Sequence, residues 1–317
     1  MSSLPLVTIG LPVYNGMPHL RTAVDALLKQ TYGNLEIMIS DNASDDGTGD
    51  YCRALAEVHP HVRYERNTEN VGPVENFRRV LARASGEYFM WAAHDDKWND
   101  GFVSAMVETL AASPAAVLAT PAVIHIQEDG GLCSEPPDRP ATGRSRTANL
   151  KLLYHDHAAT WIYGLWRSDW LARHFEEYRG FPYWGADILW LADICLRHAV
   201  VGNQEAVIFK RFRRNIHAPR SARAAVALWA YMFWHLSRIC LRRTTGFRPR
   251  VERLMLSWRY VYRLFIRRPY LLRTAWRVVR MLALAGVTSA ALGTAALISR
   301  IVRKMPAALD SAARRPV

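Results

Sequence analysis

Two adjacent carboxylates, Asp95 and Asp96, are the residues of this chain best suited to holding a metal ion. They follow the segment 87–92, which has the pattern of a strand. Carboxylates so close repel each other, and a cation or a proton relieves that repulsion. Hard cations such as Mg²⁺ and Mn²⁺ prefer carboxylate oxygens. The alternative is that one of the two aspartates only caps the following helix.

Other polar side chains stand where predicted strands end. Helix-like segments separate the first strands and follow the fourth, and the strands are predicted at 7–13, 35–40, 62–66, 87–92 and 205–209. This alternation predicts an α/β fold with a mostly parallel, doubly wound sheet. Ligands bind to such sheets beyond the carboxyl ends of the strands, where Asn15, Asp41 and Asp95 stand. A dinucleotide-binding domain is disfavoured, because the turn 12–18 has one glycine where that domain needs Gly-x-Gly-x-x-Gly.

Several motifs, in this order, resemble the family-2 glycosyltransferases. They are Pro12-Val-Tyr-Asn15, Ser40-Asp-Asn-Ala-Ser-Asp-Asp-Gly-Thr48, Asn70-Val-Gly72, and Gly86-Glu-Tyr followed by Asp95-Asp96. The resemblance covers residues 5–220. It implies a GT-A-like, Rossmann-related fold and an inverting mechanism. The donor that it implies is a nucleoside-diphosphate sugar, carried on UDP or dTDP.

The resemblance also implies where the nucleotide binds. The residues that it places in the nucleotide pocket are Pro12, Tyr14 and Asn15. Asp41 is expected to accept a hydrogen bond from a uracil or thymine imide, and its alternative is a turn-forming residue. Asn70 and Asn76 are further candidates for the nucleotide or sugar side. Helix capping or bonding within loops explains these two asparagines equally well.

The metal motif departs from the family pattern. The family has Asp-x-Asp, often with a further Asp, but this chain has Ala93, His94, Asp95 and Asp96. The leading carboxylate is therefore missing, and Asp95 is left as the main ligand, with Asp96 as a second one or bonded to acceptor or backbone. By resemblance, His217 completes the metal or diphosphate site. Mn²⁺ or Mg²⁺ is the expected cofactor, acting on the charge of the diphosphate leaving group.

An inverting transfer needs a general base for the acceptor hydroxyl, and the resemblance implies an aspartate before a late helix. Asp187 fits this place because it opens an apolar segment of helical spacing, 187–196. Its alternative is a helix N-cap without catalytic work. The Gln-x-x-Arg-Trp signature of processive synthases is absent from the sequence, which favours transfer of one sugar per encounter.

The net charge of +13 divides into two opposite parts. Residues 1–209 carry 17 basic and 26 acidic side chains, whereas residues 210–317 carry 24 basic ones and only Glu252 and Asp310 as acids. The division predicts two domains. A transferase domain is expected at 1–220, and a basic, aromatic-rich helical region that associates with an anionic membrane surface is expected at 221–317.

The expected location is the cytoplasmic side of the cell membrane. The scattered cysteines indicate neither a zinc site nor a disulfide framework, and residues 1–11 show no signal peptide. The uncharged stretch Met281–Ile298 has the minimum length of a span, and a helix lying in the membrane surface is the favoured alternative. Nucleic acid is not expected as a partner, because leucine and tryptophan are interleaved with the arginines.

The sequence thus predicts a glycosyltransferase that moves a sugar from a nucleoside-diphosphate donor to a glycan or lipid-linked acceptor. Cell-surface polysaccharide or glycolipid assembly is the expected setting. Two alternatives stay open. One is a nucleotide-sugar-binding protein without turnover, suggested by Ala93. The other is a basic scaffold that binds a membrane or nucleic acid.

Overall fold

The computed structural model describes residues 4–134, 137–156, 159–179, 186–211, 222–243, 245 and 247–266. Contacts within the chain divide it into two compact units. The described secondary structure of the first unit runs from residue 7 to residue 211, and that of the second consists of the two helices within 222–266. His217 and the stretch 281–298 lie outside the described residues.

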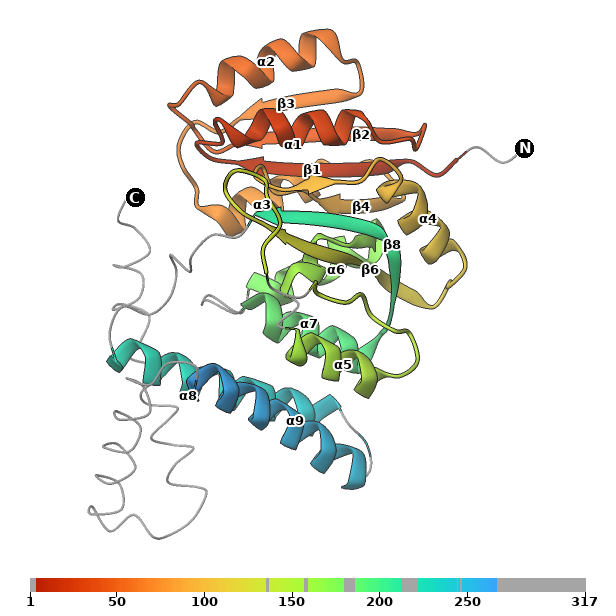
Figure 1. Ribbon diagram of the computed structural model, residues 1–317, viewed down its shortest axis with the longest axis vertical. Coiled ribbons are helices and arrows are strands. Elements are labelled where there is room, and N and C mark those ends of the chain that lie inside the picture. Colours follow the sequence, from red (N-terminus) through yellow and green to blue (C-terminus); the bar gives the residue numbers. More distant parts are fainter. Residues whose placement is uncertain are drawn as a thin grey trace. The chain divides into compact units, whose positions relative to one another are not determined.

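The described part of the first unit is an eight-stranded sheet with helices on both faces (Figure 1). The strands are β1 (Val7–Val13), β2 (Leu35–Asp41), β3 (Val62–Arg66), β4 (Tyr88–Trp91), β5 (Lys97–Trp98), β6 (Ala116–Ile126), β7 (Leu165–Arg167) and β8 (Ala199–Arg211). The helices are α1 (His19–Leu28), α2 (Thr48–Val58), α3 (Pro73–Ala82), α4 (Phe102–Ala111), α5 (Arg146–His155), α6 (Ser168–Arg179) and α7 (Ala186–Arg197), with a 3-10 helix η1 (Ala159–Tyr163) before β7.

The strand order explains where a ligand can bind. The order is β3-β2-β1-β4-β7-β6-β8-β5, and the first four strands are parallel. The chain leaves β1 toward β2 and β3, then returns to place β4 on the other side of β1. The reversal makes a topological switch point between β1 and β4, and α/β sheets bind ligands outside the carboxyl ends of strands at such a point.

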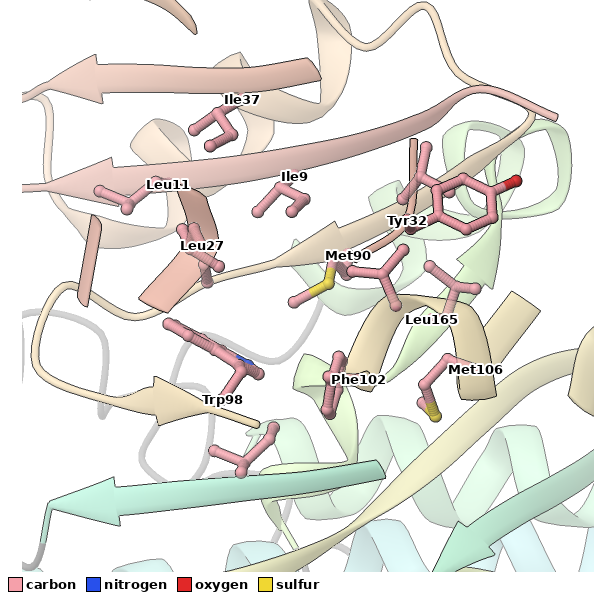
Figure 2. Packing of buried hydrophobic residues seen from close by; sticks show 14 of the residues in the cluster. Ile9, Leu11, Leu27, Tyr32, Ile37, Met90, Trp98, Phe102, Met106 and Leu165 are labelled. Carbon is pink, nitrogen blue, oxygen red and sulfur yellow. The ribbon is translucent and has the colours of Figure 1, made fainter. Parts of the chain in front are cut away.

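One face of the sheet is covered by aliphatic packing (Figure 2). Ile9 and Leu11 of β1 and Met90 of β4 point to the same side, where they meet Leu27 of α1 and Phe102 of α4. All five side chains are fully buried or nearly so. The alternation of strand side chains therefore sends one set of β4 residues to this face and the next set to the other.

The opposite face is aromatic. Phe89 and Trp91, the alternate residues of β4, lie with their ring centroids 5.0 Å apart, and Trp91 contacts Trp166 of β7 at 6.4 Å. Trp166 in turn stacks on Trp190 of α7 at 5.2 Å. These fully buried rings fasten α7 to the sheet. The position of Asp187 at the start of α7 follows from this packing.

The structure confirms the predicted fold class, with a more mixed sheet than expected. β1, β2 and β3 occupy the predicted segments, and β8 starts at Ala199 rather than at 205. Four strand pairings are parallel, and β4–β7, β6–β7 and β5–β8 are antiparallel. β5, β6 and β7 were not predicted. In β6 the strand register shifts between Pro121 and Ala122, because proline has no N–H for the ladder.

The second unit, as far as it is described, pairs α8 (Ala222–Arg243) with α9 (Phe247–Ile266). Trp258 donates its indole N–H to the Ser237 hydroxyl at 3.0 Å, and the Cys240 thiol lies 3.2 Å from the Ser257 hydroxyl. These contacts set the two helices antiparallel. Neither they nor any other helix among the described residues is long and apolar enough to cross a membrane.

Gly164 joins η1 to β7 at a place with no room for a side chain. A Cβ there would overlap the carbonyl oxygen of Ala119 and would lie 2.9 Å from a methyl carbon of Leu118. Both belong to β6, which pairs with β7 in the middle of the sheet. The close approach of the two strands at Gly164 also fixes the preceding residue, Tyr163.

We expect Gly164→Ala to lower the free energy of unfolding by about 1–3 kcal/mol or more, because the methyl group collides with backbone that cannot move aside. Gly33→Ala is the matched control, since a Cβ at Gly33 meets nothing within 4 Å. Urea denaturation of both variants checks this. Equal stability of the two variants would contradict the assigned packing.

Candidate active site

The loops after β1 and β2 are joined by hydrogen bonds that hold the first edge of the site. The backbone N–H of Asn15 donates to the Ser44 hydroxyl at 2.9 Å, and the Asn15 side-chain oxygen accepts from the Asp45 N–H at 3.0 Å. The N–H of Gly16 donates to the Thr48 hydroxyl at 3.0 Å. Asn15 has a left-handed backbone, with φ of 47°. Its amide therefore shapes the loop, whereas the neighbouring Tyr14 ring is exposed.

Asp41, at the end of β2, is fully buried and already bonded on both oxygens. One oxygen accepts from the Ser44 N–H at 2.9 Å. The other accepts from the Tyr64 hydroxyl at 3.0 Å and from the Arg66 guanidinium at 2.6 Å. Burial and the Asp41 carboxylate together raise the pKa of Tyr64 to about 12. Asp41 thus works as the centre of a local network, and its arginine partner was not predicted.

Asparagines fill the space between the ends of β2 and β3. Asn76 is 2% exposed, and its side-chain oxygen accepts from the Ser40 hydroxyl at 2.6 Å and from the Asn67 amide at 3.1 Å. The Asn76 amide donates back to the Ser40 carbonyl at 2.9 Å. Asn42 donates to Asn70 at 2.7 Å, and Asn70 accepts from the Gly72 N–H. For Asn70 and Asn76 these contacts favour bonding within the loops, one of the two alternatives left open by the sequence.

The structure separates the roles of the two adjacent aspartates. Asp96 is 1% exposed, and both of its oxygens are bonded to β8: one accepts from Lys210 Nζ at 3.0 Å and the other from the Arg211 N–H at 3.0 Å. Burial, the largest effect, raises the pKa of the Asp96 carboxyl. Burial acts to lower the pKa of Lys210, but the Asp96 carboxylate overcomes this and raises it. Asp95 is half-buried beside this pair.

Arg211 ties the aspartate loop to the loop after β6. Its guanidinium donates to the carbonyl oxygen of Asp95 at 3.2 Å and to that of Gln127 at 2.9 Å. The carboxylate of Glu128 in turn lies 2.5 Å from the imidazole of His19, at the start of α1. The ends of β1, β4, β6 and β8 are therefore linked around one edge of the sheet.

Tyr163 stands among the charged groups of this edge. The Lys210 ammonium lies 4.7 Å from the centroid of its ring. Burial raises the pKa of Tyr163 to about 12, the charge of Lys210 opposes the rise, and the charges of Asp96, Asp95 and Asp187 add to it. Tyr163 thus lies within electrostatic range of both the predicted metal ligand and the predicted base. Neither Tyr163 nor Lys210 was predicted as a site residue, because no local motif marks them.

Asp187 is the second residue of α7, and one of its oxygens accepts from the adjacent Ile188 N–H at 2.8 Å. Asp193, six residues further along the helix, forms an ion pair with Arg197, and the two side chains lie 2.7 Å apart. The described residues thus bring Asp41, Asp95, Asp96 and Asp187 to the same edge of the sheet. Among the described residues, no group of three or more His, Cys, Asp or Glu side chains is placed to hold a metal ion.

Solved structures share the fold. The fragment 1–349 of Staphylococcus aureus TarS aligns with a TM-score of 0.57 and 12% identity, over 80% of this chain and 71% of that one. The mannosyltransferase PcManGT of Pyrobaculum calidifontis, solved with GDP-Man and Mn²⁺, aligns with a TM-score of 0.55 and 19% identity, over 96% of this chain and 81% of that one. At these identities the likeness concerns the fold alone.

Sequence relatives match a little under a third of the chain. An uncharacterized glycosyltransferase of Rickettsia felis is 38% identical over 92 residues, 29% of this chain and 15% of that protein. The Bacillus subtilis glycosyltransferase TuaG, named for teichuronic acid biosynthesis, is 31% identical over 94 residues, 30% of this chain and 37% of its own length. The chain thus matches less than half of the length of these relatives.

The family model described as glycosyl transferase family 2 matches residues 8–171, more than half of the chain. The matched range contains β1 to β7, the loop with Asn15, the buried Asp41 and the Asp95–Asp96 pair. It ends before α7 and β8, which supply Asp187 and Lys210. On this match, with its GT-A-like fold, the chain belongs to glycosyl transferase family 2.

Proposed function

We propose that this glycosyltransferase transfers one sugar, with inversion, from a nucleoside-diphosphate donor to a hydroxyl of a glycan or lipid-linked acceptor. One arrangement carries the proposal: Asp95 follows β4 at the carboxyl edge of the sheet, and Asp187 opens α7, which the stack of Trp190 on Trp166 packs against the same sheet. A carboxylate for the diphosphate side and a carboxylate for the acceptor side are the two groups that such a transfer needs.

The diphosphate side is built around Asp95. Asp96 has both oxygens bonded to Lys210 and Arg211, so Asp95 is the carboxylate that would hold Mn²⁺ or Mg²⁺. A single carboxylate suits such a cation when substrate phosphates and water complete its coordination. When bound, the cation acts as a Lewis acid on the leaving diphosphate. The role of His217 as a further ligand also stays part of this proposal.

The acceptor side is built around Asp187. Its carboxylate takes the proton of the acceptor hydroxyl while the hydroxyl oxygen forms a bond to the anomeric carbon of the sugar. The bond from that carbon to the diphosphate breaks, and its electron pair stays on the phosphate oxygen. Attack from the face opposite the diphosphate inverts the anomeric centre. The buried aromatic stack behind α7 holds the base in place during this step.

The nucleoside side uses the exposed ring of Tyr14 and the network of Asp41. Pro12 and Asn15 shape the adjoining loop. An imide N–H of uracil or thymine can reach Asp41 only by sharing or displacing a donor, because Tyr64, Arg66 and the Ser44 N–H occupy both oxygens. We keep UDP or dTDP as the proposed carrier. The structures of TarS with UDP and with UDP-GlcNAc support a uridine carrier. PcManGT was solved with GDP-Man, so the neighbours do not all use the same carrier.

Cell-surface polysaccharide or glycolipid assembly is the proposed setting, supported by the likeness to TuaG. The second candidate, a nucleotide-sugar binder without turnover, is favoured by one observation. Ala93 removes a carboxylate from the metal motif, and Asp96 cannot replace it while Lys210 holds it. The enzyme is supported by the place of Asp187, the proposed base, at the start of a helix that packs on the same sheet as Asp95.

Calorimetric titration with UDP, dTDP and GDP, each with Mn²⁺ and with EDTA, tests the donor site. We expect one of these nucleotides to bind and Mn²⁺ to increase the affinity. In Asp95→Asn the increase should vanish, because the metal loses its carboxylate. In Asp96→Asn it should persist. Wild-type protein that binds none of the nucleotides would refute the proposed function, and an unchanged metal effect in Asp95→Asn would refute the ligand assignment.

Asp187→Asn should keep donor affinity and lose turnover by about 10²–10⁴-fold, because a base acts on the transition state. Asp169→Asn is the matched control: Asp169 is also a carboxylate in the first turn of a helix, α6, and it is exposed. Donor hydrolysis and transfer assays measure turnover. If both variants keep turnover and lose the same amount of stability, Asp187 only caps its helix and is not the base.

We further propose that the second unit binds the anionic cytoplasmic face of the cell membrane. Among its described side chains, the large apolar ones that reach solvent include Trp234 and Leu241 of α8 and Val251, Met255 and Trp258 of α9. In each helix they recur at spacings of three, four or seven residues, which is one helical face. The bond between Trp258 and Ser237 brings the two faces together. Exposed arginines, among them Arg238, Arg242 and Arg259, accompany them.

The membrane proposal predicts that Trp234→Ala/Trp258→Ala and Arg238→Gln/Arg242→Gln/Arg259→Gln both weaken binding to vesicles of anionic lipid. Each arginine near such a surface contributes about 1 kcal/mol, so the triple variant should bind about a hundredfold more weakly. Val58→Ser, a loss of an exposed apolar residue in α2, is the control. Co-sedimentation of each variant with the vesicles measures the binding. If both the tryptophan variant and the arginine variant bind as the wild type does, the surface of α8 and α9 is not the membrane-binding one.

A further inference from the structure

Lys210 is a half-buried lysine at the functional edge whose side chain is partly exposed. Its side chain is 27% exposed, whereas that of its partner Asp96 is 1% exposed. Its Nζ lies 3.0 Å from Asp96 Oδ2 and 4.7 Å from the centroid of the Tyr163 ring. An ammonium has three N–H donors. Among the side chains and carbonyls that the structure describes, Asp96 is the acceptor of one of them.

Two explanations compete for this lysine. In the first, Lys210 only balances the charge of Asp96, which would otherwise be buried alone. Charge balance alone does not explain why the pair is present. Replacing a buried ion pair by well-packed apolar residues often leaves the stability of a protein unchanged or raises it. In the second, the ammonium also binds a ligand. The 27% exposure of its side chain, and the one acceptor found for its three donors among the described residues, favour the second explanation.

The charges around the site indicate which ligand Lys210 would bind. Asp96 and Lys210 cancel, and Ala93 contributes no charge where a carboxylate would otherwise stand. Of the two adjacent aspartates, Asp95 is then the one proposed to hold a divalent cation. A nucleoside diphosphate gains negative charge on its phosphates as it leaves, and fixed cations aimed at that charge stabilise it. Lys210, like Arg211, is a fixed cation that β8 brings to the loop that carries Asp95.

We propose that Lys210 donates directly to the diphosphate of the donor and of the released nucleotide, as a cation that does not depend on the metal. This inference rests on the proposed function and adds a binding residue to it. Asp96 and the Tyr163 ring then act as positioning groups, because they hold the ammonium at one point. Lysine is suited to the role as a compact point charge.

The test compares Lys210→Met, Lys210→Arg and Asp96→Asn/Lys210→Met with the wild type in the full chain. The ligand is whichever of UDP, dTDP and GDP the wild type binds best, measured by calorimetry with Mn²⁺ and again with EDTA. The corresponding nucleoside, followed by ligand-observed NMR, reports on the pocket without phosphates. The double variant removes both members of the pair, so it leaves no buried charge alone. Lys29→Met, an exposed lysine at the end of α1, controls for the loss of one positive charge.

We expect Lys210→Met and the double variant to bind the diphosphate about tenfold to a hundredfold more weakly, as for the loss of a hydrogen bond to a charged group. Nucleoside binding and the effect of Mn²⁺ should stay unchanged, and Lys210→Arg should keep most of the affinity. Circular dichroism shows whether each variant is folded.

Three results would overturn the inference while leaving the proposed function intact. Recovery of wild-type affinity in the double variant would show that Lys210 only balances Asp96. An equal loss for the nucleoside would show a change in pocket shape. A loss confined to the Mn²⁺ titration would show that Lys210 acts through the metal site. Absence of binding by the wild type to all three nucleotides would overturn both the inference and the function.

Discussion

The bond between Asp96 and the end of β8 is the contact on which the site depends. It joins the loop after β4 to a strand more than a hundred residues later, through Lys210 Nζ and the Arg211 N–H. Because Asp96 is buried, removing either partner would leave an uncompensated charge, which is among the most destabilising changes in a protein. Arg211 extends the link to the carbonyl of Asp95 and to the loop after β6. The half-buried Asp95 is thereby held at the rim of the site by its more deeply buried neighbour.

The sequence predicted the parts of the site that lie in local motifs. Asn15, Asp41 and Asp95 stand at the ends of parallel strands as the alternation indicated, because the carboxyl ends of such strands share one edge. Lys210 and Tyr163 could not be found in this way. Their significance comes from partners that are distant in sequence, and an isolated lysine in a strand or tyrosine beside a glycine has many ordinary explanations.

The fold shows the same limit. β6 was not predicted, and its register against β8 shifts at two places, between Ala116 and Leu118 and between Pro121 and Ala122. The sequence favoured Asp95 as the main ligand and left Asp96 as a second ligand or as bonded to acceptor or backbone; in the structure both carboxylate oxygens of Asp96 are bonded to Lys210 and Arg211 of β8. Burial distinguishes them, and burial is a property of tertiary packing. The proposals about the acidic first part and the basic second part rest on composition, which sequence reports directly.

The asparagine network beside Asp41 has a consequence for how the two halves of the site respond to conditions. Asn42, Asn67, Asn70 and Asn76 bond to one another and to Ser40 through amides, which do not change protonation state. The sugar-transfer side of the site contains ionisable groups instead. They are the carboxylates of Asp95, Asp96 and Asp187, the ammonium of Lys210 and the phenol of Tyr163. Acidity or a bound cation therefore alters the electrostatic field on the sugar-transfer side, while the bonds among these four asparagines and Ser40 do not depend on a protonation state. On the nucleoside side the ionisable part is the group of Asp41, Tyr64 and Arg66, and the asparagines beside it form a frame without ionisable groups.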